Sequence, residues 1–270
     1  MIRKALVALD GTPESERALP WLRCLAPRAK LVLLRSSFPL YVPGPEGTGV
    51  AVPIVQDDAL EYLDGVARAL KPRPQTVVAA GAPVPALLEE AERRTCDLIA
   101  LATLGGDAIR RRIVGGTTEK LLHHAQVPLL VVPSWKPKPP RRIRTVAVPV
   151  DGGRPSEEIL LRLKPWAKRQ GVKIVLVHAH PPGEPSVDWL RRLEAGLKKA
   201  GLKAARSLTS GPLPEAILEG AAKAKADLIA LSTRGHGALT HLLKGGLVSR
   251  LIQATFAPVL VVRATTQDST

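Results

Sequence analysis

Two aspartates suggest a binding site, because each follows a short apolar run and precedes a glycine. Asp10 ends the segment KALVALD, and Asp151 ends the segment TVAVPVD. This pattern is typical of a buried strand that leads into a turn. A carboxylate at such a turn can accept hydrogen bonds from a ligand's hydroxyl groups, or it can simply cap the turn. Both interpretations stay open from the sequence.

Two glycine-bearing loops provide a second candidate feature. The segment DLIALATLG (97–105) is followed by nine residues and the pair Gly115-Gly116, and DLIALSTRG (227–235) by nine residues and Gly245-Gly246. Glycine lets backbone amides approach a phosphate closely, and the start of a helix adds unpaired amides with a favourable dipole. The loops are therefore candidate phosphate sites, although a glycine pair that starts a helix often reflects only tight packing.

These features occur twice because the chain contains an internal repeat. Residues 5–19 align with 146–160 at an offset of 141, and residues 97–105 align with 227–235 at an offset of 130. The terminal runs VPLLVV (127–132) and APVLVV (257–262) match at the same offset of 130. We expect a domain at 1–133, a Pro-rich linker at 134–143, a second domain at 144–264 and a disordered tail at 265–270. The extra residues of the first half fall in the Pro- and Gly-rich segment 38–56, which we expect to be an extended loop.

The elements that must position these residues alternate between strands and helices. The apolar runs are too continuous for strands with one wet face, and they favour a parallel sheet buried on both faces. The strands are expected near 3–9, 31–36, 75–80, 97–102 and 128–132, then 144–150, 173–179, 203–208, 227–232 and 258–263. The helices are expected near 13–26, 57–70, 84–94 and 117–125, then 155–169, 186–200, 213–225 and 247–254. This alternation predicts two α/β domains, each a doubly wound five-stranded parallel sheet with about four helices.

With these blocks in place, the chain resembles the universal stress protein family over nearly its whole length. Nucleotide-binding members of that family show G-x-x-G, nine residues, and then G-(S/T). The resemblance implies a Rossmann-like, adenine nucleotide alpha hydrolase-like fold that pairs through its last strands, here as an intramolecular pseudo-dimer. The chain departs from the motif at its first glycine, which is Ala102 or Ser232, and at its Ser/Thr, which is Gly116 or Gly246.

The resemblance also implies which residues bind an adenine nucleotide: ribose beside the aspartate, adenine near Ala8 or Pro149, and phosphates on the glycine pairs. The candidates in the first half are Ala8, Asp10, Ala102, Gly105, Gly115, Gly116, Thr117 and Thr118. Those in the second half are Pro149, Asp151, Ser232, Arg234, Gly235, Gly237, Gly245, Gly246, Leu247 and Val248. We expect the second half to be better equipped, because Arg234 adds positive charge where the first half has Leu104.

Composition limits the remaining classes of function. The net charge of +15 favours association with polyanions, but no nucleic-acid recognition motif accompanies it, so no specific nucleic acid partner is expected. There is no long apolar run or leader pattern and there are only two cysteines, which favours a cytoplasmic protein without a membrane partner. His178 and His180 alternate at a strand end, but two histidines alone are a weak metal signal, and we expect no metal site.

The chain lacks the signatures of a dedicated catalyst. No Walker lysine motif, kinase catalytic loop or catalytic triad pattern is present, so no catalytic residue is assigned. The sequence therefore indicates a stress-response sensor or scaffold that binds ATP, or ADP or AMP, in at least one half, with Mg²⁺ bound through the phosphates. The alternatives are a scaffold that binds no nucleotide and a slow ATPase. An unidentified protein partner and a further homodimer are compatible with a nucleotide-binding sensor and with a scaffold that binds no nucleotide.

Overall fold

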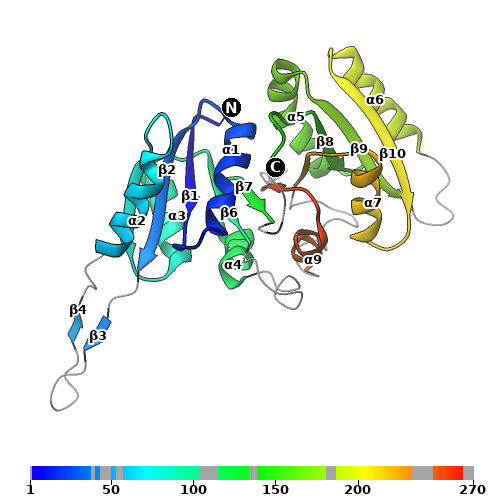
Figure 1. Cartoon of the computed structure of the whole chain (residues 1–270). Helices are drawn as coiled ribbons and strands as arrows, with labels where there is room; N and C mark the ends of the chain where they lie inside the picture. Colours follow the sequence, from blue (N-terminus) through cyan, green and yellow to red (C-terminus); the bar gives the residue numbers. More distant parts are fainter. Residues whose placement is uncertain are drawn as a thin grey trace, which may run out of the picture.

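The computed structural model describes residues 2–37, 40–42, 50–52, 57–103, 115–133, 135, 139–180, 187–232 and 246–263. In the first half a 3-10 turn, η1 (Ser15–Arg17), leads into the first α-helix (Figure 1). The strands of this half are β1 (Lys4–Ala8), β2 (Lys30–Ser37), β3 (Leu40–Val42), β4 (Val50–Val52), β5 (Gln75–Ala80), β6 (Leu98–Ala102) and β7 (Leu129–Val132). Its helices are α1 (Ala18–Leu25), α2 (Asp57–Arg68), α3 (Pro83–Arg93) and α4 (Gly116–His124).

The second half repeats this order. Its strands are β8 (Thr145–Pro149), β9 (Lys173–His180), β10 (Lys203–Ser210), β11 (Leu228–Ser232) and β12 (Val259–Val262). Its helices are α5 (Arg154–Gln170), α6 (Asp188–Lys199), α7 (Glu215–Lys223) and α9 (Leu247–Ala254). The strands and helices expected from the sequence are thus present, with ends displaced by a few residues. Among the described residues, no helix is both long and apolar enough to cross a membrane.

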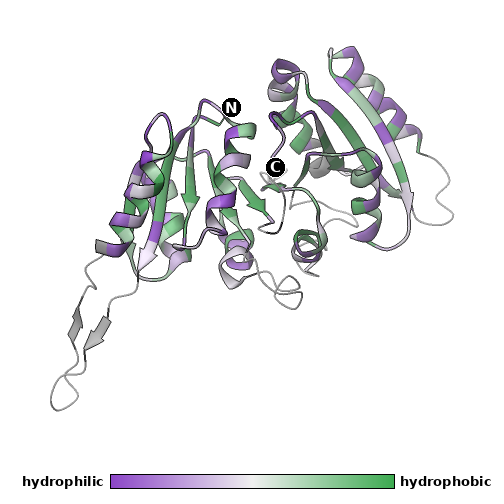
Figure 2. Ribbon diagram, in the orientation of Figure 1, coloured by the Kyte–Doolittle hydropathy of each residue, from purple (hydrophilic) through white to green (hydrophobic). Residues whose placement is uncertain are grey.

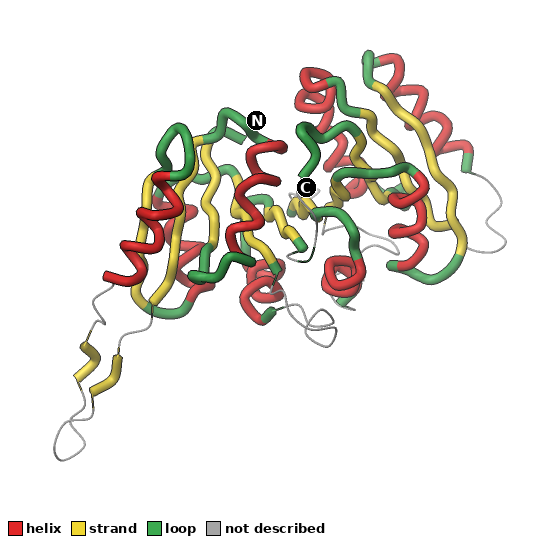
Figure 3. The backbone as a smooth tube through the Cα atoms, viewed as in Figure 1, coloured by secondary structure: helices red, strands yellow, loops and turns green. Residues whose placement is uncertain are grey.

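One ten-stranded sheet runs through both halves in the order β10-β9-β8-β11-β12-β7-β6-β1-β2-β5 (Figure 3). Within each half the neighbouring strands are parallel, whereas β7 and β12 pair antiparallel, with Leu130 opposite Leu260. The two halves therefore join through their last strands, as an internal pseudo-dimer. The predicted doubly wound fold is confirmed.

Helices cover both faces of this sheet, which explains the continuous apolar strands. One core cluster contains residues of α1, α2, α5 and α6, and the other contains residues of α3, α4, α7 and α9. Successive strand residues alternate between the clusters: Leu33 packs in the first and Leu34 in the second. Most strands are accordingly hydrophobic (green in Figure 2), whereas the outer strand β10, with the sequence KAARSLTS, is largely polar.

The repeated DLIAL segments hold the start of each half's first strand. Asp97 Oδ2 accepts hydrogen bonds from the amides of Arg3 and Lys4 at 2.7 and 2.9 Å. Asp227 Oδ2 accepts the equivalent bonds from Arg144 and Thr145 at 2.7 and 3.0 Å. This aspartate therefore has a structural role at the amino end of the sheet.

Two local predictions were wrong. The segment 38–56 is not wholly a loop: β3 and β4 pair antiparallel, with Tyr41 opposite Ala51, and lie away from the main sheet (Figure 1). Their Leu, Tyr and Val residues favour strands, and this outweighs the Pro and Gly content between them. The helix expected at 13–26 does not begin at 13: η1 is followed by α1, in agreement with the expectation that Pro20 kinks or restarts the helix. Pro20 lies in the first turn of α1, where no amide donor is needed.

Further contacts join the halves beside the β7–β12 pair. The indole Nε1 of Trp166 in α5 donates to the carbonyl of Leu25 in α1 at 3.0 Å. Cys24 Sγ lies 3.0 Å from the carbonyl of Pro140, which belongs to the segment between the halves. Of the expected linker, residues 134 and 136–138 lie outside the described residues, as does the expected tail 265–270.

Candidate functional site

The site is set by the strand order. In the first half the chain moves outward from β1 to β2 in one direction and returns to β6 on the other side of β1. In the second half β8 and β11 have the same relation. Ligands of doubly wound sheets bind beyond the carboxyl ends of the strands at such a switch point. In the first half this point lies beyond Ala8 and Ala102.

A cavity of about 260 Å³ occupies that switch point in the first half. It collects residues from the ends of β1, β2 and β6 and from the starts of α3 and α4. Its lining consists of Ala8, Leu9, Asp10, Ser15, Leu34, Arg35, Ser36, Pro83, Leu87, Leu101, Ala102, Gly115, Gly116, Thr117 and Thr118. Every candidate residue of the first half is thus brought to one cavity except Gly105, which lies outside the described residues.

Asp10 both caps its turn and faces the cavity. Its Oδ1 accepts hydrogen bonds from the amide of Thr12 at 2.9 Å and from the Thr12 hydroxyl at 2.6 Å. The same oxygen accepts both bonds, and the residue is exposed. The capping interpretation is therefore confirmed for one carboxylate oxygen, and it leaves Oδ2 as an acceptor toward the cavity.

Arg35 brings a positive charge to the same cavity from the end of β2. Its Cζ lies 5.5 Å from the centre of the Tyr62 ring, which is a cation–π distance. It also lies 3.0 Å from the position that a Cβ on Gly11 would occupy, and Gly11 has φ of +95°. Glycine is needed here for both reasons, because the positive φ strains other residues and a side chain would displace the guanidinium.

Tyr62, whose ring lies beneath the Arg35 guanidinium, is a protonated phenol. Burial raises the pKa of Tyr62 to about 12, with the Glu16 carboxylate adding to the rise and a hydrogen bond with Ser15 opposing it. The Tyr62 hydroxyl donates to Glu16 Oε1 at 3.0 Å. The aromatic face beneath Arg35 is therefore fixed by a side chain that stays neutral at physiological pH.

The start of α4 forms the opposite wall. Gly115 is its N-cap and Gly116 its first residue, so the first amides of the helix have no partner within the helix. A Cβ on Gly116 would meet no atom of the described residues within 4 Å. The space beside this glycine is open toward the cavity, which suits close approach of an anion to the amides.

A buried hydroxyl lies next in sequence to the cavity wall. Thr103 is 4% exposed, and its Oγ1 has no hydrogen-bond partner in the part of the chain that the structure describes. Ser232, at the same switch point of the second half, is 8% exposed, and its Oγ likewise lacks a partner among the described residues. An unpartnered buried hydroxyl is costly, so each of these hydroxyls is expected to have a partner beyond the described residues or in a ligand.

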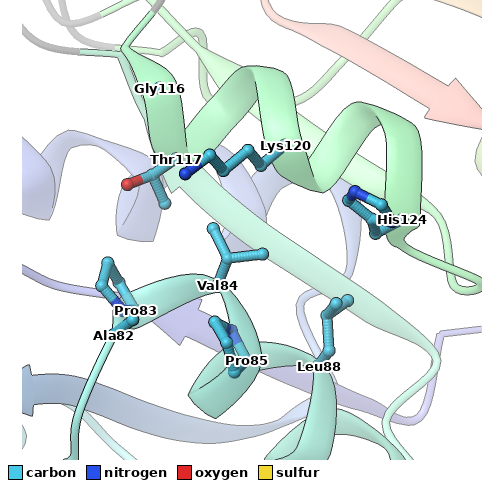
Figure 4. Close-up of a pocket in the computed structure, with 9 residues that line it drawn as sticks. All are labelled: Ala82, Pro83, Val84, Pro85, Leu88, Gly116, Thr117, Lys120 and His124. Atoms are coloured by element: carbon cyan, nitrogen blue, oxygen red, sulfur yellow. The ribbon is translucent and has the colours of Figure 1, made fainter.

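A larger groove of about 680 Å³ adjoins the cavity between α3 and α4 (Figure 4). The cavity and the groove share Pro83, Gly116 and Thr117. The floor of the groove is apolar, and the Thr117 hydroxyl and the Lys120 ammonium lie together at the upper side of the groove (Figure 4). Ligand cavities usually measure about 300–1,000 Å³, so the groove extends a small cavity into that range.

In the second half, part of the expected site lies outside the described residues: Arg234, Gly235, Gly237 and Gly245. Pro149 ends β8 and Ser232 ends β11, as expected. Asp151 Oδ1 accepts the amide of Gly153 at 3.0 Å, which is the turn cap seen at Asp10. The Val248 side chain is buried in the core, and only the backbone of Leu247 is described.

The two copies differ in their chemistry around the first turn. In the first half Gly11 lies against Arg35. In the second half Gly152 takes its place and lies against Trp189: a Cβ built on Gly152 would be 3.4 Å from the Trp189 ring. His178 stands edge-on to Trp189, with ring centres 5.1 Å apart, and its Nδ1 is 2.9 Å from the Val150 carbonyl. No group of three or more His, Cys, Asp or Glu that could hold a metal gathers among the described residues.

Sequence reasoning missed Arg35, Ser36 and Pro83. It considered only the ends of the first and fourth strands, whereas the ends of all parallel strands in one half lie at the same edge of the sheet. An arginine and two serines at the end of the apolar run 31–34 were the available signal.

Comparison with known proteins agrees with this architecture. The sequence model of the universal stress protein family matches residues 1–133 and 142–263. A universal stress protein of Mycolicibacterium smegmatis is 27% identical over 96% of both chains. A Thermus aquaticus universal stress protein is 32% identical, with 98% of its length matched by 44% of this chain.

A solved structure gives the same result for the fold. The crystal structure of a universal stress protein from Archaeoglobus fulgidus superposes with a TM-score of 0.78 at 20% identity, covering 98% of this chain and 97% of the other. Two matches to the family model, one in each half, account for the internal repeat. The chain therefore belongs to the universal stress protein family and carries two copies of its domain.

Proposed function

We propose that this protein binds an adenine nucleotide, ATP in the first instance, in the cavity of its first half. The observation that carries the proposal is the convergence of Asp10, Ala102 and the Gly115–Thr118 segment on one cavity at the switch point. These residues come from three segments far apart in the sequence. Family membership makes a nucleotide the first ligand to test.

The lining suggests how such a ligand would bind. Asp10 Oδ2 is an acceptor suited to the ribose hydroxyls, because Oδ1 is already used by Thr12. The first amides of α4, which have no partner within the helix, suit the phosphates. Arg35 on one side and Lys120 on the other supply positive charge.

The proposed role is that of a sensor or scaffold rather than a catalyst. The cavity residues offer binding and charge, and Mg²⁺ would be held through the nucleotide's phosphates. A transferring phosphoryl group also needs a positioned nucleophile, and none of the lining residues is assigned that role. An unidentified protein partner would read the change that binding makes at α4.

A scaffold without nucleotide is the second candidate, and two residues favour it. Ala102 adds a Cβ at the cavity where the family motif has glycine, and Gly116 lacks the hydroxyl that the motif supplies. The loss of one such hydrogen bond costs about 0.5–1.5 kcal/mol net. This weakens a site built from backbone amides without abolishing it.

Titration calorimetry with ATP, with and without Mg²⁺, tests the proposal. Asp10→Asn keeps the side-chain oxygen that caps the turn but removes the charge that the ribose would use, so we expect weaker binding with unchanged stability. Asp58→Asn, at an exposed position of α2, is the matched control. Asp151→Asn tests the second half in the same way. Absence of binding at millimolar ATP in folded protein would replace this proposal with the scaffold.

A further inference from the structure

The positive charge of the chain is divided unequally between its halves. Residues 1–133 contain 16 Lys and Arg against 14 Asp and Glu, whereas residues 142–263 contain 20 against nine. Most of the net charge of +15 therefore belongs to the second half. An asymmetry of this kind between two halves of a chain is typical of a protein that binds a polyanion on one side.

Part of this charge gathers at the amino ends of the second half's strands. Lys173 starts β9 and Lys203 starts β10, and the strand register places them directly opposite each other. Neighbouring strands lie about 4.8 Å apart. Arg144 precedes β8, and its carbonyl accepts the amide of Lys173 at 2.8 Å. Three exposed cationic residues thus lie side by side along one edge of the sheet.

The ends of the adjacent helices extend this row. Lys168 in α5 lies 3.5 Å from the would-be Cβ of Gly201, two residues before β10 begins. Lys199 ends α6. We define the basic edge as the exposed residues Arg142, Arg144, Lys168, Lys173, Lys199 and Lys203. Helix dipoles favour cations at Lys168 and Lys199, but they do not account for those at the strand starts.

Two carboxylates of the second half already have partners in the structure. Asp227 accepts the amides of Arg144 and Thr145. Glu194 is paired with Lys198 at 2.6 Å and with Arg206 at 2.5 Å. Within the described part of the chain, no residue of the basic edge makes an ion pair with an acidic side chain. Unpaired like charges repel each other, so their close grouping favours an external anion.

We propose that the basic edge binds the phosphate backbone of a nucleic acid without reading its sequence. A row of lysines and arginines supplies the contacts that neutralise phosphates. Contacts from Lys and Arg to phosphates carry no sequence information, so no sequence preference is expected. The exposed large apolar residues of the described chain are Leu60, Leu161 and Leu208, none of them in the basic edge, and this disfavours membrane insertion.

Fluorescence anisotropy with a labelled 30-base-pair duplex tests this proposal in the full-length protein. If four phosphates are neutralised, the logarithm of affinity should fall with the logarithm of salt with a slope of about −4, so affinity drops about 10²-fold between 50 and 200 mM salt. The double variant Lys173→Glu/Lys203→Glu should lower that slope by about 2. It should bind at least about tenfold more weakly at low salt.

A matched charge change in the first half provides the control. Lys30, which starts β2 as Lys173 starts β9, and Lys71 are both exposed, so Lys30→Glu/Lys71→Glu alters the net charge equally. We expect this control to bind almost as the parent does. Equal losses in the two variants would show that only net charge matters, and would overturn the proposal. Binding to anionic vesicles with no binding to the duplex would overturn it as well.

Discussion

A substitution at Gly116 tests whether the start of α4 binds the phosphates, and it should not destabilise the fold. Gly116 is the first residue of α4, and a Cβ there would meet no atom within 4 Å in the part of the chain that the structure describes. In a helix, alanine is more stabilising than glycine by about 0.5–1 kcal/mol. For a chain of this size, each kcal/mol of unfolding free energy shifts the melting temperature by about 2–4 °C. Gly116→Ala should therefore leave the melting temperature unchanged or raise it by about 1–3 °C.

The same methyl group should weaken nucleotide binding. It would project into the space shared by the cavity and the groove, beside the amides proposed to hold the phosphates. Hydrogen bonds to a charged group contribute about 1.5–3 kcal/mol each. Loss of one such bond predicts a dissociation constant about 10- to 100-fold higher, measured by calorimetry with ATP.

Gly65 provides a matched control for this substitution. It is an exposed helical glycine of α2, and a Cβ there also meets no atom of a described residue within 4 Å. Gly65→Ala should raise stability in the same way and leave affinity for ATP unchanged. If Gly116→Ala bound ATP as tightly as the parent protein, the phosphates would not rest on the start of α4, and the assigned geometry would be wrong.

Three further predictions concern stability. A Cβ on Gly220 would lie 2.5 Å from Val177 Cγ1, so Gly220→Ala should destabilise the protein by about 1–3 kcal/mol, read from urea unfolding. The pKa of Glu194 is lowered mainly by its hydrogen bond with Lys198. The ionised carboxylate therefore contributes fully to the free energy of unfolding above the ordinary glutamate pKa, and this contribution is lost as pH falls through the pKa of the folded state. The difference in urea midpoint between parent and Glu194→Gln should therefore be large at pH 7 and shrink toward pH 3. Trp166→Phe removes the hydrogen bond to the α1 carbonyl and should cost about 0.5–1.5 kcal/mol; an unchanged midpoint would show that this contact between the halves is dispensable.

The fold could be predicted because its signals are local and repeated. Runs such as 31–34 and 98–101 are apolar at every position, and both faces of the sheet are indeed covered. Asp10, Ala102 and Gly115 could be grouped because parallel strands place their carboxyl ends at one edge. Pattern and spacing thus determine which residues meet, provided that the strand order follows the family.

What could not be predicted depends on side-chain packing and on backbone angles. The position of Arg35 over Tyr62 and Gly11 depends on a helix and a turn far apart in the sequence. Gly116 and Gly246 occupy the same motif position, yet Gly116 is helical and Gly246 is an N-cap with φ of +65°. The sequence gives both as glycine and does not distinguish these conformations.

The junction of the two halves has a consequence for how they can evolve. Leu25 and Trp166 are in contact and stand 141 positions apart, the offset that relates Asp10 to Asp151. In a homodimer, a residue on the twofold axis must meet its own copy, so a large residue is forced to face an equally large one. Within a single chain the two equivalent positions can mutate independently, so a leucine in one half can face a tryptophan in the other. Assembly is also independent of protein concentration, so neither half has to retain a surface that recognises itself.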